Sequence, residues 1–363
     1  MSQKQQIFAF HLLNDRSGSP KVLSQLLKDW VNKEKTVHLH TSKHEHGFLS
    51  RLNGVNYHYS KYQFKEHPWL RLIYFVKTQL VLMFTMFFHI KKGDLVYINT
   101  VLPFGAAILG KLKGCRVIYH VHESTVNPPI LKWFLFKILG WTASEIINVS
   151  KYVAQSHQIK IIPNHLVYNA LDEGFIAEMH PKTNREHPKN VMMVCSLKAY
   201  KGVFEFIDLA KSNPKFQFRL VLNAEQSAIS AFFKTTDIPS NTTIFPAQNN
   251  LHTFYQWADV ILNLSRPDGW IETFGLTIIE GMAYGLPAIV PPVGGILEVI
   301  EEEITGYSVD SRQKEELNNK LNQLLGKSES YKAFSAEAKK RVLVFKEQLM
   351  LQNIDAIIQK NRS

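Results

Sequence analysis

Two carboxylates, Glu272 and Glu280, close the otherwise small or apolar stretch "ETFGLTIIE". On one continuous helix a separation of eight residues would leave them roughly 80° apart around the axis, so they would not share one face. No Lys or Arg lies between them to form an ion pair. A carboxylate accepts paired hydrogen bonds from neighbouring hydroxyl groups, each contributing roughly 1.5–3 kcal/mol. The pattern therefore indicates two hydroxyl-binding acids, with two solvated surface acids as the alternative.

The stretch lies where a strand leads through a loop into a helix. "DVILNLS" reads as the strand, "RPDGWIETFG" as the loop and "LTIIEGMAYG" as the helix, with Gly275 at its entrance. Amides at the start of a helix are free to bind an anion, so we expect the amides near 274–276 to lie beside one. One acid could then hold a ribose and the other a sugar, with a diphosphate between them.

A basic turn, "SLKAYKG", follows another predicted strand and contains Ser196, Lys198 and Lys201. Lysine is unfavourable at the start of a helix, because the helix dipole is positive there. Two lysines at this place are useful if an anion binds between the strand end and the helix, and they are otherwise solvated side chains.

The first half of the chain has two weaker candidate sites. Gly18 in "NDRSGSP" allows a tight turn before a helix whose first amides could meet an anion. His122 in "YHVHES" lies at the end of a predicted parallel strand, where ligand sites of open α/β sheets occur. A structural turn and a structural histidine are the alternatives.

Strand-like runs alternate with helical patterns along the whole chain, which indicates α/β domains with parallel sheets. The polar stretch 180–190, "HPKTNREHPKN", interrupts the alternation and reads as a linker. Residues 1–184 contain 22 Lys and Arg against 11 Asp and Glu, whereas residues 185–363 contain 20 of each, so the net charge of +11 belongs to the first half. A basic half beside a neutral half suggests an anionic partner, with nucleic acid and an anionic membrane both open.

Several of these motifs together resemble the retaining GT-B glycosyltransferases of the large family usually numbered 4. "ETFGLTIIE" fits the E-x7-E motif of that family, and "GMAYGLPAIVPPVGGILEVI" and "ITGYSVD" resemble its continuation. "SLKAYKG" is similar to the family's basic turn, and "HVHE", "NVSKYV" and "VYNALDEGF" to its N-terminal markers. The similarity extends over nearly the full length, in the expected order.

The resemblance implies an α/β GT-B fold with two Rossmann-like domains facing across a cleft. The first domain would comprise residues 1–172, on the acceptor side, together with a C-terminal helix at 343–363 that crosses back to it. A linker at 173–190 would lead to the nucleotide-sugar-binding domain at 191–342. An apolar stripe through Val344, Leu349, Ile354 and Ile358 would dock the C-terminal helix.

The resemblance also assigns roles to residues. His122, Glu272 and Lys201 would be catalytic, with Lys201 on the donor diphosphate and Glu272 on the donor sugar. Glu280 would contact the ribose. The expected donor-binding residues are Gly18, Ser196, Lys198, Lys201, Arg266, Glu272, Thr273, Phe274, Gly275, Leu276 and Glu280. The sequence departs from the family at Cys195-Ser196, where Gly-Arg is frequent, so Lys198 or Arg266 would replace a phosphate-binding arginine.

The function implied is transfer of a hexose with retention from a nucleotide-sugar, a UDP-sugar above all, to a glycan or lipid-linked acceptor. No Asp-x-Asp motif stands at a strand end, so we expect neither a metal nor a cofactor. A nucleotide-sugar epimerase or glycogen-synthase-like enzyme on the same fold is the first alternative. A non-enzymatic basic protein that binds nucleic acid or membranes is the second, although two acids at the site would repel a nucleic acid.

Two apolar segments raise the possibility of membrane contact. Residues 68–90 form a helix-length apolar run, and residues 128–144 place Trp133 and Trp141 beside Lys132 and Lys137. Tryptophan beside lysine on an apolar helix suits a membrane interface, although both helices could instead cover a sheet. Neither the N-terminus nor an apolar run has the pattern of a signal peptide or a bilayer span. We therefore expect a cytoplasmic protein in peripheral contact with the anionic inner face of the membrane, serving cell-envelope polysaccharide synthesis, with no nucleic-acid partner.

Overall fold

The structure is a computed structural model that describes residues 5–60, 67–157, 159–180, 182 and 186–360. The chain divides into two compact units, the first formed by residues 1–168 with 351–363 and the second by residues 169–350. Parts of the linker predicted at 173–190 and of the tail predicted at 343–363 lie outside the described residues. Each unit is built around its own parallel sheet.

The first unit contains a seven-stranded sheet in the order β3-β2-β1-β4-β5-β6-β7, and every pair in it is parallel. Its central strands are buried along their whole length, as expected for a parallel sheet covered on both faces. The strands are β1 (Ile7–Phe10), β2 (Val37–Ser42), β3 (Val55–Ser60), β4 (Leu95–Asn99), β5 (Arg116–Val121), β6 (Glu145–Asn148) and β7 (Asn164–Leu166).

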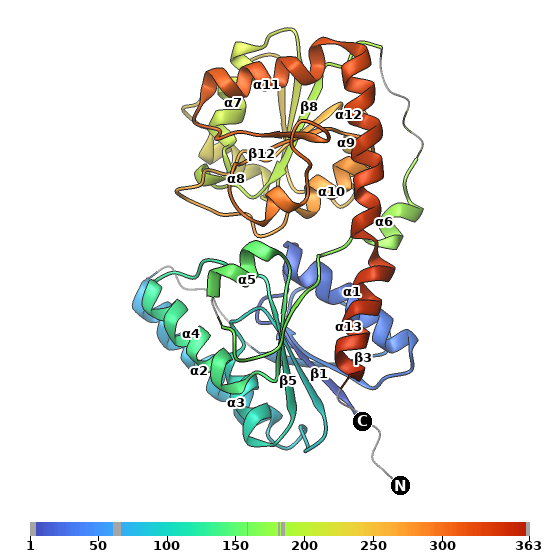
Figure 1. Cartoon of the computed structure of the whole chain (residues 1–363). Coiled ribbons are helices and arrows are strands. Elements are labelled where there is room, and N and C mark those ends of the chain that lie inside the picture. The colour runs from blue at the N-terminus through green and yellow to red at the C-terminus, as the bar shows by residue number, and fades with distance from the viewer. Residues whose placement is uncertain (1–4, 61–66, 158, 181, 183–185, 361–363) are drawn as a thin grey trace. The chain divides into compact units, whose positions relative to one another are not determined.

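Helices connect these strands in the alternation that the sequence predicts, except between β2 and β3, which follow each other without a helix. Figure 1 shows α2, α3 and α4 gathered along one side of the first sheet. Helix α3 packs against both α2 and α4. The helices of this unit are α1 (Gly18–Asn32), α2 (Pro68–Met86), α3 (Phe104–Leu112), α4 (Pro129–Thr142), α5 (Lys151–His157) and the part of α13 (Glu347–Gln359) from residue 351 onward.

Helix α13 is fixed to the first unit by charged contacts. The carboxylate of Asp355 forms ion pairs with Lys33 and with Lys35, the latter at 2.9 Å. Arg116 donates hydrogen bonds to the backbone carbonyls of Ile357 and Ile358 at the last turn of the helix. Because terminal carbonyls of a helix have no partner within it, this arginine satisfies groups that burial would otherwise leave unpaired.

The apolar stripe predicted for this helix is wrong in part. Ile354 and Ile358 are buried, but Val344 and Leu349 are 42% and 47% exposed. A step of five residues turns roughly 140° beyond a full rotation, so the first three predicted positions do not lie on one face. The buried face instead follows helical spacing through Met350, Ile354, Ile357 and Ile358.

The second unit contains a six-stranded parallel sheet in the order β10-β9-β8-β11-β12-β13. The strands are β8 (Asn190–Cys195), β9 (Gln217–Leu222), β10 (Thr242–Phe245), β11 (Val260–Leu262), β12 (Ala288–Val290) and β13 (Gly306–Ser308). Its core is formed by apolar residues of the strands together with those of α7 and α11, such as Phe206, Phe218 and Leu321.

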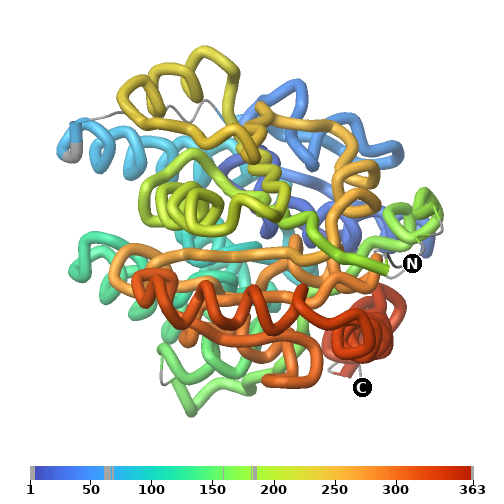
Figure 2. Tube along the Cα trace, turned by 90° about the horizontal axis from the view of Figure 1, so that it is seen from above, coloured from blue at the N-terminus to red at the C-terminus, as the bar shows by residue number. Residues whose placement is uncertain are grey.

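Helices α11 and α12 pack against each other in this unit, and α12 is seen nearly end-on in Figure 2. The helical segments are α6 (Glu173–Ala177), η1 (Ala199–Lys201), α7 (Val203–Ser212), α8 (Gln226–Phe232), α9 (His252–Trp257), α10 (Leu276–Ala283), η2 (Gly295–Glu298), α11 (Lys314–Gly326), α12 (Ser328–Arg341) and η3 (Val342–Phe345). Helix α6 occupies the first part of the segment predicted as a linker.

Helix α2 in the first unit buries two polar residues together with the apolar residues Phe75, Leu82 and Met86. Thr78 and Gln79 are buried, and the Gln79 Oε1 accepts a hydrogen bond of 2.9 Å from the amide of Gly105 on α3. Among the described residues, α2 is the one helix long and apolar enough to cross a bilayer by length and composition alone, with a mean hydropathy of 1.2 over Trp69–Met86. Only 28% of that window is buried, so many of the apolar side chains of α2 are exposed.

Candidate functional site

The strand order of the second sheet reverses between β8 and β11. The chain runs outward from β8 to β9 and β10 and then returns to β11 on the other side of β8. Loops that leave the carboxyl ends of two such strands diverge, and ligands of open α/β sheets bind between them. The turn η1 follows β8 and carries Lys201, and the loop after β11 carries Glu272. The topology therefore brings two predicted catalytic residues of this unit to one place.

Lys201 and Glu272 form an ion pair at this point of the sheet. The hydroxyl of Ser265 donates a second hydrogen bond, of 3.0 Å, to Glu272 Oε1. Burial by itself would raise the pKa of Glu272, but the charge of Lys201 and hydrogen bonds from Lys201, Asn263 and Ser265 outweigh it and lower that pKa. The side chains are only 13% and 18% exposed, so the two charges depend on each other for compensation.

Two glycines allow the loops to come this close. Gly202, directly after Lys201, has a φ of 78°, and a Cβ there would lie 2.1 Å from the carbonyl oxygen of Leu264. Gly294 has a φ of 107°, and a Cβ there would lie 2.4 Å from the carbonyl oxygen of Glu272. Both positions combine a left-handed backbone with a close approach, so side chains larger than hydrogen would push the site apart.

An exposed aromatic ring lies beside the ion pair. The ammonium of Lys201 is 4.6 Å from the ring centre of Trp270, which is within the range of a cation–π contact. Tyr200 stacks against the same indole with a centroid distance of 5.9 Å and an interplanar angle of 15°. Trp270 remains 44% exposed, so its ring can also contact a flat or apolar ligand group.

The entrance of α10 follows Glu272 within a few residues. Gly275 has a φ of 127° and caps the helix without a side-chain hydrogen bond, so the first amides of α10 are not capped by that residue. Of the predicted neighbours, Phe274 is buried and packs edge-on against Phe345 with a centroid distance of 5.5 Å. Thr273 and Leu276 flank this turn and are partly exposed. A helix start without a side-chain cap, next to a cation, is suited to an anion.

Glu280 lies one helix turn further on and has a different partner. It is buried on α10 and accepts a hydrogen bond of 2.6 Å from the hydroxyl of Tyr255 on α9. Burial raises the pKa of Tyr255 well above its usual value, and the nearby charge of Glu280 raises it further. The two acids of the motif thus belong to two hydrogen-bonded groups, one around Lys201 and one around Tyr255.

The remaining predicted residues of this unit surround the basic turn. The backbone carbonyls of Ser196 and Lys198 accept the hydrogen bonds that shape it, at 2.8 and 3.0 Å, while the side chain of Lys198 is exposed. The guanidinium of Arg266 lies 3.8 Å from carboxylate oxygens of Glu205 and of Asp268. Lys198 therefore has a free approach to an anion, whereas the charge of Arg266 is partly compensated within the protein.

In the first unit, Asn99 links His122 to Ser19, the residue that follows Gly18. Asn99 ends β4, which neighbours β1 at the point where the strand order of the first sheet reverses. His122 Nε2 lies 3.0 Å from Asn99 Oδ1, and Asn99 Nδ2 donates to the carbonyl of Ser19 at 3.1 Å. Because the side-chain Oδ1 of Asn99 can only accept, Nε2 of His122 carries the proton, and Nδ1 is an acceptor in the neutral ring.

The histidines around this network are neutral. Burial lowers the pKa of His122 well below its usual value, and His120 and His11 nearby lower it further. Burial also lowers the pKa of His11 to about 4. In contrast, burial raises the pKa of Glu123 to about 7, although the amides of Val101 and His122 donate to its carboxylate at 3.2 and 3.3 Å. Of these groups, Glu123 therefore has the pKa nearest to neutral pH.

Five residues of these groups were missed by the sequence analysis. Asn99 could have been found, because it ends a central strand where such sites form. Glu123 directly follows His122, but the sequence indicates no partner for its carboxylate. Ser265, Tyr255 and Trp270 have no local signal, since their roles depend on loops and helices that meet only in the fold. Within the described residues, no group of three or more His, Cys, Asp or Glu side chains could hold a metal ion.

Comparison with known proteins gives a family match in the second unit. Residues 175–341 match the family model described as "Glycosyl transferases group 1". An uncharacterized 42.6 kDa protein in the cps region of Klebsiella pneumoniae is 25% identical over 57% of this chain and 60% of its own length. The N-acetyl-alpha-D-glucosaminyl L-malate synthase of Bacillus anthracis is 27% identical over 56% of each chain. The chain thus spans little more than half of these relatives.

Solved structures match the whole chain. The crystal structure of Anabaena Alr3699/HepE in complex with UDP and glucose has a TM-score of 0.78 at 16% identity, covering 98% of this chain and 99% of the other. Its complex with UDP-glucose has a TM-score of 0.78 at 17% identity, with the same coverage. The predicted fold is confirmed: the chain consists of two parallel-sheet Rossmann-like domains of the GT-B class.

Proposed function

We propose that this chain is a retaining, metal-independent hexosyltransferase of the E-x7-E family numbered 4. It would move a sugar from a nucleotide-sugar, a UDP-sugar by preference, to a glycan or lipid-linked acceptor. The observation that carries the proposal is the Lys201–Glu272 ion pair at the strand-order reversal of the second sheet, beside the uncapped start of α10. A cation, helix-start amides and carboxylates are what a diphosphate joined to two polyhydroxyl groups requires.

The comparisons support this proposal from two sides. The family match covers the unit that contains the ion pair, the basic turn and α10. The Anabaena protein was solved with UDP and glucose and with UDP-glucose, and the Bacillus anthracis relative is named as a glucosaminyl L-malate synthase. The Klebsiella pneumoniae relative lies in a cps region, which favours a role in envelope polysaccharide synthesis.

The ion pair suggests how the donor is received. Lys201 is compensated by Glu272 before a donor binds, so neither charge is left alone in a largely buried place. An entering diphosphate would draw Lys201 to itself and release Glu272 to accept hydrogen bonds from the donor sugar. The exchange keeps both charges paired throughout, which avoids the cost of a buried single charge. Glu280, held by Tyr255, would accept the ribose hydroxyls.

The positive groups around the diphosphate indicate how the site would assist the chemical step. The bond between the anomeric carbon and the diphosphate oxygen breaks, and its electron pair remains on the diphosphate. Lys201 and the first amides of α10 would stabilise this growing charge, with Lys198 more available than Arg266 as a second cation. The acceptor oxygen would form the new bond to the anomeric carbon, and its proton would pass to the departing diphosphate oxygen. His122 is neutral and would orient a sugar hydroxyl by hydrogen bonding through Nδ1 rather than by charge.

The proposal is tested by thermal unfolding of the full chain in the presence of UDP-glucose, UDP-N-acetylglucosamine and GDP-mannose, each with EDTA. A donor at a hundred times its dissociation constant stabilises the unit that binds it by about 2.7 kcal/mol, so at least one should raise the melting temperature. The proposal fails if none does so, or if the shift requires a divalent metal. Prolonged incubation with the donor alone separates a transferase from an epimerase, which would produce a second nucleotide-sugar without an acceptor.

A peripheral contact with an anionic membrane belongs to the same proposal. Trp133 and Trp141 on α4 are 61% and 53% exposed, with Lys132 and Lys137 on the same helix. Exposed tryptophans beside lysines suit the headgroup region at the cytoplasmic face. Replacing both lysines by Glu should abolish sedimentation with phosphatidylglycerol vesicles while donor affinity is unchanged. Equal sedimentation of the wild type and this variant would exclude α4 as the contact.

A further inference from the structure

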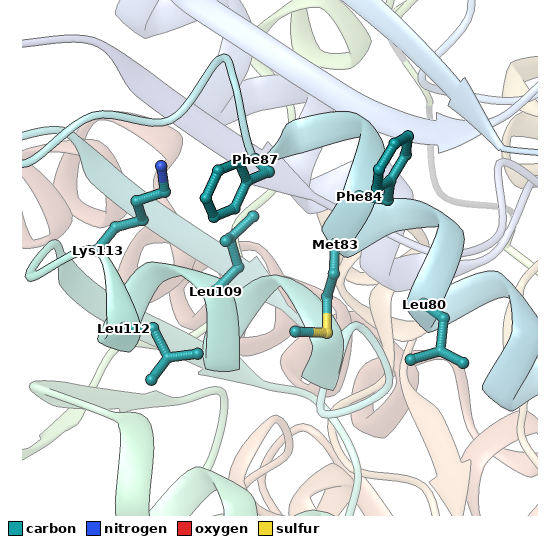
Figure 3. A pocket seen from close by; sticks show the side chains of 7 residues that line it. All are labelled: Leu80, Met83, Phe84, Phe87, Leu109, Leu112 and Lys113. Carbon is teal, nitrogen blue, oxygen red and sulfur yellow. The ribbon is translucent and has the colours of Figure 1, made fainter.

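An open groove lies between α2 and the C-terminal end of α3 in the first unit (Figure 3). Its volume is about 520 Å³, and it is lined by Leu80, Met83, Phe84, Phe87, Leu109, Leu112 and Lys113. Such a volume lies within the range of roughly 300–1,000 Å³ of small-ligand sites. Three lining residues, Leu80, Phe84 and Leu112, are themselves 61%, 74% and 68% exposed, so the groove opens to the outside.

The lining determines what can enter. Six of the seven lining residues are apolar, so a polar ligand would lose hydrogen bonds to water without gaining others. The exception is Lys113, whose ammonium is held 3.7 Å from the ring centre of Phe87 at one side of the groove. An apolar body with one negative end matches this arrangement, because the body covers the leucine and phenylalanine side chains while the end meets the ammonium.

The surroundings of Lys113 are basic. Lys92 lies beside Gly114, since a Cβ on that glycine would be 3.8 Å from Lys92 Cγ, and Lys91 and Lys111 are exposed nearby in the chain. Asp94, the acid that follows Lys91 and Lys92 in the sequence, is buried and accepts hydrogen bonds from the amides of Lys91 and Gln6. It therefore points away from this surface, and the lysines set the potential at the groove.

The charge pattern also argues against a second copy of this chain as the occupant. Helices α2, α3 and α4 contain no Asp or Glu, while they contain Arg71, Lys77, Lys111, Lys132 and Lys137. Two such faces brought together would oppose like charges. A bilayer with anionic headgroups complements the face instead, and further exposed apolar side chains lie on α2 and on α4.

We propose that this groove holds one acyl chain of an anionic phospholipid, with the phosphate next to Lys113. The site differs from the proposed donor site and requires more than the surface contact proposed above. Surface contact leaves both chains of each lipid in the bilayer, whereas here one chain leaves its neighbours and packs between α2 and α3. Such a lipid would hold the first unit in one orientation relative to the bilayer.

The test uses the full chain and lysophosphatidylglycerol below its micelle concentration, with native mass spectrometry to count bound molecules. Leu112→Trp fills the groove from an exposed position and should weaken uptake of the probe at least tenfold. Ile130→Trp is the matched control, because Ile130 is 73% exposed on α4 outside the groove, and it should take up one molecule like the wild type. Leu80→Gln repeats the test if Leu112→Trp lowers the melting temperature.

The charge contribution is tested with Lys113→Gln. This variant should bind lysophosphatidylglycerol about tenfold less tightly, with a smaller change for lysophosphatidylcholine, whose headgroup has no net charge. A phosphatidylglycerol with a photoreactive group at its chain end, in vesicles, should label the groove residues of the wild type and not those of Leu112→Trp.

Three results would overturn the proposal. Equal uptake by Leu112→Trp and the wild type would mean that the chain lies elsewhere. Labelling confined to Trp69, Trp133 and Trp141 would leave membrane contact standing but remove the groove. A dimer that forms on concentration, and that Leu112→Trp abolishes without any uptake of the probe, would assign the groove to a second copy. None of these results bears on the nucleotide-sugar measurements.

Discussion

Because Lys201 and Glu272 form an ion pair, neutralising the lysine should lower the free energy of unfolding strongly. The loss should depend on whether Glu272 still carries its charge. Lys201→Met keeps most of the side-chain length but leaves a carboxylate that is only 18% exposed, with Ser265 still bonded to it. Removing one partner of a fully buried pair costs about 3–5 kcal/mol. The remaining exposure of both groups lowers the expected loss to about 2–3 kcal/mol. The double variant Lys201→Met/Glu272→Gln should be more stable to unfolding than Lys201→Met by at least about 1.5 kcal/mol, because no charge is then left unpaired.

The pH dependence of this loss gives a second readout. In the wild type the pair and its hydrogen bonds hold the pKa of Glu272 below its ordinary value, against the effect of burial. The contribution of Glu272 to stability is therefore complete above the pKa of glutamate in the unfolded chain, about 4.3. It is lost as the pH falls through the lower pKa of Glu272 in the folded chain. In Lys201→Met burial raises that pKa instead. The difference in free energy of unfolding between the wild type and Lys201→Met should therefore become smaller as the pH falls from neutral.

Urea unfolding followed by hydrogen-exchange mass spectrometry separates the two units, with peptides from β8 and β11 reporting on the second. Lys211→Met is the matched control. Its partner Asp237 is 87% exposed, so the change should stay below about 0.5 kcal/mol. If Lys201→Met and Lys211→Met cost the same, or if Glu272→Gln gives no recovery, the ion pair is not formed in solution and the reasoning is refuted.

Three further predictions concern other groups. Glu280→Ala should weaken UDP binding by about ten- to a hundredfold, since the ribose loses a charged acceptor, and unchanged affinity by calorimetry would remove Glu280 from the site. Asp355→Asn should lower the stability of the first unit by about 1–2 kcal/mol above pH 4, and this difference should disappear at lower pH. The reason is that the effect of Lys33 and Lys35 outweighs that of burial and lowers the pKa of Asp355. A difference in melting temperature that does not change with pH would contradict this. Glu123, with its pKa raised to about 7, favours the folded state when protonated, so the stability of the first unit should fall as the pH rises from about 4.5 to 7, by up to about 1.4 kcal/mol per pH unit. The same slope in Glu123→Gln would show that another group causes it.

The sequence predicted both sheets because alternating apolar strands and helical patterns report burial directly. It did not predict that β8 would lie next to β11, since that adjacency depends on the chain returning after β9 and β10. Lys201 and Glu272 were therefore assigned separate partners, a phosphate and a sugar, and their ion pair was not foreseen. Glu280 was placed on a helix, but its contact with Tyr255 depends on how α9 packs against that helix.

Helix α2 shows a second limit of sequence patterns. Its apolar run and its few polar residues were visible, but an apolar helix fits a sheet face and a bilayer surface equally well. The fold decides which side faces inward, and here Thr78 and Gln79 are buried while Phe84 and Phe88 are each 74% exposed. The C-terminal helix shows the same limit, because apolar residues were linked at a five-residue spacing that no helix face follows.

Titration calorimetry of UDP into the full chain in EDTA tests whether Lys201 belongs to a metal-independent diphosphate site. We expect saturable binding of one UDP per chain by the wild type and by Lys211→Met. Lys201→Met, shown to be folded by circular dichroism, should bind at least tenfold more weakly, because a charge-assisted contact to the diphosphate is lost. Equal affinity in Lys201→Met, or binding that appears only when a divalent metal replaces EDTA, would contradict the claim.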